Sequence, residues 1–108
     1  MAYRVEYTFS AKEDIKSAKK YILDHFRYRQ YAESYTKKIK EAEARLRNLP
    51  TLPPSIGFYY RGYEIYLMVH KKYLFPYIVD GKTITVIRVF EDGMDWKRIL
   101  ERWIKQNR

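Results

Sequence analysis

The sequence contains no cysteine, and its 108 residues include only two histidines and four glycines. Without cysteine, disulfides, thiol catalysis and thiolate metal sites are excluded. His25 and His70 lie far apart, with no metal-ligand spacing around either, so we expect neither a metal site nor a cofactor. The glycines are isolated and do not form a phosphate-binding loop.

Long apolar runs are also missing, since none approaches the roughly 18 residues that a membrane-spanning helix needs. Residues 1–16 alternate polar and apolar side chains and lack the apolar core of a signal peptide. We therefore expect a cytoplasmic protein with no membrane partner. The chain length and the 46% of hydrophobic residues predict one domain over residues 1–108.

Positive charge, by contrast, is in excess: the formal net charge is +9, from 22 Lys and Arg against 13 Asp and Glu. Residues 1–50 carry a net +5 and residues 51–108 a net +4, so the charge does not sit in a tail. It favours an anionic partner, such as nucleic acid, an acidic protein segment or a membrane surface, without choosing among them. A solvated basic surface with no such partner is the alternative.

Hydrophobic periodicity predicts the elements of the N-terminal half. Residues 3–9 alternate in the manner of a strand, and residues 10–13 (SAKE) fit a capping box that begins a helix. After a break near residues 26–30, residues 32–49 repeat apolar side chains at steps of three and four. This spacing predicts a second helix, packed antiparallel on the first and ending before the proline that follows.

The following residues are mostly strand. Residues 50–57 hold three prolines and form a loop, and residues 58–69 form one interrupted strand or two short ones. Residues 73–79 form a strand in which Pro76 argues for an edge or a bulge, because proline has no amide hydrogen to donate. A further strand covers residues 83–90.

Turn and cap residues complete the predicted order. Asp80-Gly81 is a strong signal for a two-residue hairpin turn, and Asp95 can cap a last helix. The order is thus β-α-α-β-β-β-α. It predicts an α+β fold, with an antiparallel sheet packed by an N-terminal helical hairpin and a short C-terminal helix, the helices sharing one face of the sheet.

This order, together with several short stretches, resembles the RelE/ParE toxin superfamily of type II toxin–antitoxin systems. The first helix carries the family's Ala-x-x-Asp-Ile element at Ala11, Asp14 and Ile15. The closing hairpin resembles the family's aromatic strand followed by Asp-Gly-x-Ile-x-Val-x-Arg-Val. The matching residues there are Tyr73, Leu74, Tyr77, Asp80, Gly81, Ile84, Val86, Arg88 and Val89.

The resemblance implies a growth-arresting toxin, of the kind that stabilises plasmids, held silent by an acidic antitoxin protein. ParE-like members poison DNA gyrase without nuclease activity, and RelE-like members cleave mRNA on the ribosome. Many members have a His and an Arg where this chain has Glu91 and Gly93-Met94, and nuclease members tend to have an Arg where it has Leu74. These departures favour the ParE-like branch. A RelE-like nuclease and a decayed toxin acting as a binding module are the alternatives.

Metal-free RNA cleavage would need a base, an acid, and cations that stabilise the charged phosphorane. Arg61, Arg88 and Tyr73 are the catalytic candidates if the chain is a nuclease. Phosphate contacts are assigned to the two arginines together with Lys71, Lys72 and Lys82. A salt bridge is the alternative for Arg88, and a solvated turn the alternative for the two adjacent lysines.

The last helix carries a wide apolar stripe that includes Trp96, Ile99 and Trp103. So wide a stripe on a small helix favours an interaction surface, and we expect the antitoxin to bury these three residues. The alternative is that the stripe belongs to the core.

Overall fold

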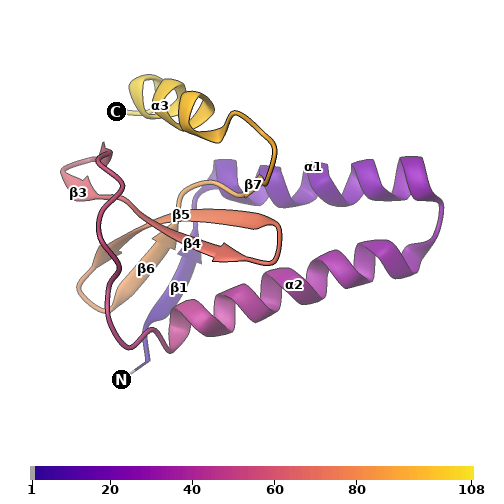
Figure 1. Cartoon of the computed structure of the whole chain (residues 1–108), viewed down its shortest axis with the longest axis horizontal. Helices are drawn as coiled ribbons and strands as arrows, with labels where there is room; N and C mark the ends of the chain where they lie inside the picture. Colours follow the sequence, from indigo (N-terminus) through magenta and orange to yellow (C-terminus); the bar gives the residue numbers. More distant parts are fainter. Residues whose placement is uncertain (1) are drawn as a thin grey trace.

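A central sheet organises the computed structural model, which describes residues 2–108 (Figure 1). Its strands, in spatial order, are β1 (Arg4–Tyr7), β6 (Thr83–Val86), β5 (Tyr73–Asp80) and β4 (Tyr66–His70), with β7 (Phe90–Glu91) also paired to β5. The predicted antiparallel pairing is confirmed for β4, β5, β6 and β7, whereas β1 runs parallel to β6.

Two helices, α1 (Phe9–Phe26) and α2 (Arg29–Arg47), form the predicted hairpin and cover one face of the sheet. Arg27 joins them in the left-handed conformation, with φ of 60°, which reverses the chain within two residues. The other face is covered by α3 (Trp96–Gln106) and by a separate hairpin of β2 (Tyr59–Tyr60) and β3 (Tyr63–Glu64). The α+β class is confirmed, but the expectation that all helices share one face is wrong.

Strand β5 shows why both faces need cover. Tyr73, Phe75 and Tyr77 point into the core beneath the helical hairpin, and Leu74 and Ile78 point into the core beneath α3. All are buried, so β5 is apolar on both sides, as strands covered on two faces are. Helices on one face alone would leave half of this strand in water.

Pro76 lies in this central strand, so the edge position considered above is wrong. The Ile87 amide donates to the Pro76 carbonyl (2.9 Å), and proline has no N–H to donate in return. The Ile87 carbonyl instead accepts from Thr8 Oγ1 (2.6 Å). Residues 87–89 lie opposite only two residues of β5, between the pairs Tyr77–Val86 and Leu74–Phe90, which confirms the bulge.

Three local predictions are corrected. The cap of α1 is Thr8, whose side chain accepts from the Ala11 amide (3.1 Å), and Ser10 lies inside the helix. The hairpin loop after β5 is Gly81-Lys82, one residue later than predicted, because Asp80 still pairs with Thr83. Asp95 occupies the cap position of α3 but makes no side-chain capping bond. Within residues 2–108, no helix is long and apolar enough to cross a membrane.

Candidate functional site

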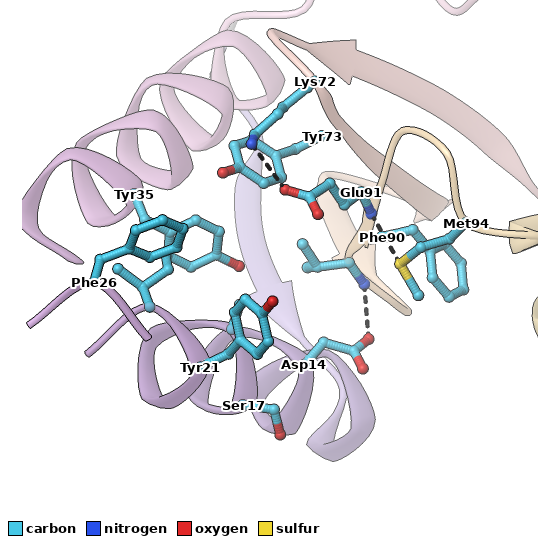
Figure 2. Close-up of a pocket in the computed structure, with 13 residues that line it drawn as sticks. Asp14, Ser17, Tyr21, Phe26, Tyr35, Lys72, Tyr73, Phe90, Glu91 and Met94 are labelled. Atoms are coloured by element: carbon cyan, nitrogen blue, oxygen red, sulfur yellow. Dashed lines mark hydrogen bonds and ion pairs between the residues drawn. The ribbon is translucent and has the colours of Figure 1, made fainter. Parts of the chain in front are cut away.

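A pocket of about 540 Å³ lies between the helical hairpin and the adjoining ends of β5 and β7 (Figure 2). Its walls are mainly aromatic and aliphatic. The lining residues are Asp14, Ser17, Ala18, Tyr21, Ile22 and Phe26 of α1, Tyr35 of α2, Lys72 and Tyr73, and Val89, Phe90, Glu91 and Met94. The pocket therefore collects the first helix, the start of the aromatic strand and the turn before α3, which lie far apart in the sequence.

Two tyrosines form the base of the pocket. Tyr35 and Tyr73 are buried and pack edge to face, with ring centroids 5.1 Å apart. Burial is the largest cause that raises the pKa of Tyr35, and it also raises the pKa of Tyr73. Both phenols therefore stay protonated near neutral pH, and neither is poised to act as a general base.

Lys72 and Glu91 form an ion pair beside these rings, with Nζ and Oε1 3.1 Å apart. The hydrogen bond to Glu91 raises the pKa of Lys72. A lysine must have a lowered pKa to exchange protons near neutral pH, so this shift is in the wrong direction for acid–base work. Lys72 can still offer a positive charge to a partner.

Arg88 is bound by Asp14 behind the pocket wall. Its Nε and one terminal nitrogen donate to the two oxygens of that carboxylate, at 2.7 and 2.8 Å. The Val89 amide donates to the same carboxylate (2.9 Å), and the guanidinium lies over the ring of Phe90. The structure thus shows the salt-bridge alternative for Arg88, in which both of its bidentate donors bind Asp14 of the same chain.

The other cations proposed as phosphate contacts are dispersed. Lys72 and Lys82 flank the eight-residue strand β5, so they lie roughly 25 Å apart along it. Lys71 lies with Lys72 in the turn before β5, and Arg61 lies in the turn between β2 and β3, on the other side of the sheet. Of the six candidates, the structure brings only Lys72 and Tyr73 into the pocket, with Arg88 adjacent through Asp14.

The predicted antitoxin stripe on α3 faces inward. Trp103 is only 9% exposed, its ring lies 5.0 Å from that of Tyr60, and its Nε1 donates to Ser10 Oγ (2.8 Å). Trp96 and Ile99 are partly buried against the same core. In this chain the stripe therefore covers the second face of the sheet.

Sequence reasoning missed the aromatic part of the pocket. Tyr21, Phe26 and Met94 line it but were not singled out. Tyr21 and Phe26 are large apolar residues that stay exposed on α1. Because α1 already has one apolar face, further large apolar side chains around the same helix were the signal that could have indicated this pocket.

His70 lies outside the pocket and pairs with Glu41 (2.9 Å). Within residues 2–108, no three His, Asp or Glu side chains gather as a metal site requires.

Solved structures share this architecture. A chain of the chromosomal ParDE toxin–antitoxin system from P. aeruginosa aligns with a TM-score of 0.67 at 15% identity, covering 85% of this chain and 98% of that one. A chain of the E. coli DinJ-YafQ toxin–antitoxin complex aligns with a TM-score of 0.54 at 20% identity, covering 84% and 93%. The fold is therefore of the ParE/RelE type.

The sequence itself identifies the family. A sequence model described as the ParE toxin of the type II toxin–antitoxin system parDE matches residues 5–96. The chain belongs to this ParE toxin family. A search of curated protein sequences found no match.

Proposed function

We propose that this chain is the toxin of a type II toxin–antitoxin pair and that it arrests growth by inhibiting DNA gyrase, without nuclease activity. Membership of the ParE toxin family supports the toxin role. The observation that carries the choice of target is the ion pair beside the pocket: Arg88, the cation best suited to hold a phosphate, is already bound by Asp14.

The protonation states in the pocket support the same choice. RNA cleavage needs one group that takes a proton and another that gives one. The pKa values of Lys72 and Tyr73 are both raised, so neither group can act as the one that takes a proton near neutral pH. A protein that works by binding needs no such exchange. It can use the same pocket as an apolar surface with a charged border.

Inducible expression in a bacterium tests the proposal. We expect growth arrest with a DNA-damage response and with intact messenger RNA, mapped by sequencing of 5′ ends. Arrest with new cuts in translated messages would replace gyrase by the ribosome as the target. Full growth, with the protein shown to be folded and expressed, would leave only the binding-module alternative.

We also propose an acidic antitoxin as partner, because the chain carries a net +9. Of the three stripe residues on α3, the antitoxin can reach the partly exposed Trp96 and Ile99, whereas Trp103 is covered by Tyr60. Amide hydrogen exchange of the chain with and without its antitoxin tests this. We expect added protection in the first turns of α3, and unchanged exchange there would remove α3 from the interface.

A further inference from the structure

The turn between α1 and α2 lies at the end of the helical hairpin that extends beyond the sheet (Figure 1). We call residues 21–31 the hairpin tip. Four of its aromatic side chains are exposed by about half or more: Tyr21 by 57%, Phe26 by 51%, Tyr28 by 63% and Tyr31 by 48%. The ring of Tyr31 lies 5.7 Å from that of Phe26 and 6.0 Å from that of Tyr28, so three of the rings form one cluster.

The helices that lead into and out of the tip are rich in lysine and arginine. Residues 16–40 contain eight Lys and Arg against two Asp and Glu, a net +6 out of +9 for the chain. Within the tip itself, the exposed Arg27 and Arg29 stand next to Phe26 and Tyr28 in the sequence, and Asp24 is the one carboxylate. The comparison of residues 1–50 with residues 51–108 does not reveal this excess, because the two parts carry nearly equal net charge.

We propose that the hairpin tip binds single-stranded nucleic acid. Exposed aromatic rings flanked by lysine and arginine are what such strands need, because bases stack on the rings while the cations neutralise phosphates. Protein interfaces are depleted of charge at their centres, whereas nucleic-acid interfaces are strongly positive. A single strand is preferred over a duplex because only unpaired bases offer free faces to the rings. The inference goes beyond gyrase inhibition and holds whether or not gyrase is the target.

Fluorescence anisotropy of the purified chain with a labelled 20-nucleotide oligothymidylate tests the proposal at several salt concentrations. The ring variant Tyr28→Ala/Tyr31→Ala should weaken binding at least about tenfold, since each stack contributes on the order of 1 kcal/mol or more. The charge variant Arg27→Gln/Arg29→Gln should flatten the slope of log Kd against log salt by about 1.4, or roughly 0.7 for each phosphate that is no longer neutralised. All four residues are exposed, so both variants should keep the circular dichroism spectrum of the parent chain.

The matched control is Tyr59→Ala/Lys105→Gln, which removes one exposed ring and one exposed charge away from the tip and should bind like the parent. A duplex of the same length should bind more weakly than the single strand. Charge alone would produce the opposite order, because the duplex has the higher charge density. Absence of binding at 50 mM salt, equally weakened binding in the control, or preference for the duplex would overturn the proposal. Displacement of the oligonucleotide by polyglutamate at equal charge would point to an acidic protein instead.

Discussion

The carboxylate of Asp14 accepts both side-chain hydrogen bonds of Arg88, and their side chains are 17% to 18% exposed. The pair joins α1 to the bulge between β6 and β7, 74 residues later in the chain. Each residue belongs to one of the two stretches that carry the family resemblance. Through this contact the two separate motifs act together. The pair holds the helical hairpin against the sheet and closes the back of the pocket.

We expect Arg88→Ala to lower the free energy of unfolding by about 2–3 kcal/mol, because it leaves the partly buried Asp14 carboxylate without its charged partner. Urea unfolding followed by circular dichroism measures this. The exposed pair Arg98–Asp95 supplies the control, and Arg98→Ala should cost no more than about 0.5 kcal/mol. If Arg88→Ala were as stable as the parent chain and yet harmless to cells, Arg88 would be a target contact after all.

Tyr73→Phe should leave growth arrest intact. The phenyl ring keeps the edge-to-face contact with Tyr35, and the missing hydroxyl is one that a gyrase inhibitor does not need for proton transfer. Growth curves after induction at matched protein levels give the answer. A harmless Tyr73→Phe variant with normal thermal stability would instead favour the nuclease alternative, in which this hydroxyl acts as an acid.

Thr8→Val should lower the free energy of unfolding by about 2 kcal/mol. The Thr8 hydroxyl caps α1 at the Ala11 amide and also donates to the Ile87 carbonyl, so its removal takes away a cap and leaves a carbonyl of the bulge unpaired. Valine keeps the shape of the side chain, and Thr8→Ser, which keeps the hydroxyl, should cost far less. Equal destabilisation in the two variants would mean that the methyl group, not the hydroxyl, matters here.

Alkaline pH should destabilise the fold through its buried tyrosines. Burial raises the pKa of Tyr77 from 10.0 to about 12, and raises those of Tyr7 and Tyr35 as well. In the unfolded chain these phenols ionise near pH 10 while the folded protein still holds them protonated. Their contribution is therefore fully present below about pH 10 and is lost as the pH rises toward 12.

Urea unfolding midpoints at pH 8 to 11 measure this decline, and absorbance at 295 nm reports phenolate directly. We expect Tyr7, Tyr35 and Tyr77 to ionise only well above pH 10 or together with unfolding. Tyr77→Phe should reduce the dependence of stability on pH above pH 10. A single titration step for all tyrosines in a chain that remains folded would contradict the expectation.

The sequence by itself determined the order of the elements, because helix and strand periodicities and turn residues are local signals. The hairpin of residues 9–47, the proline-rich loop and the closing strands lie where those signals place them, to within a few residues. The family also follows from short motifs read in order. Even the bulge opposite Pro76 was one of the two expectations for a proline within a strand, because proline has no amide hydrogen to donate.

Only the tertiary structure decided which residues meet. The parallel pairing of β1 with β6, the position of α3 on the second face and the binding of Arg88 by Asp14 all depend on contacts between residues far apart in the chain. The alternation that predicts a strand does not show which other strand pairs with it. The position of a cation in the sequence likewise does not show whether a carboxylate lies beside it in the fold. For the same reason, the ring of Tyr31 meets those of Phe26 and Tyr28 only because α1 and α2 fold back on each other.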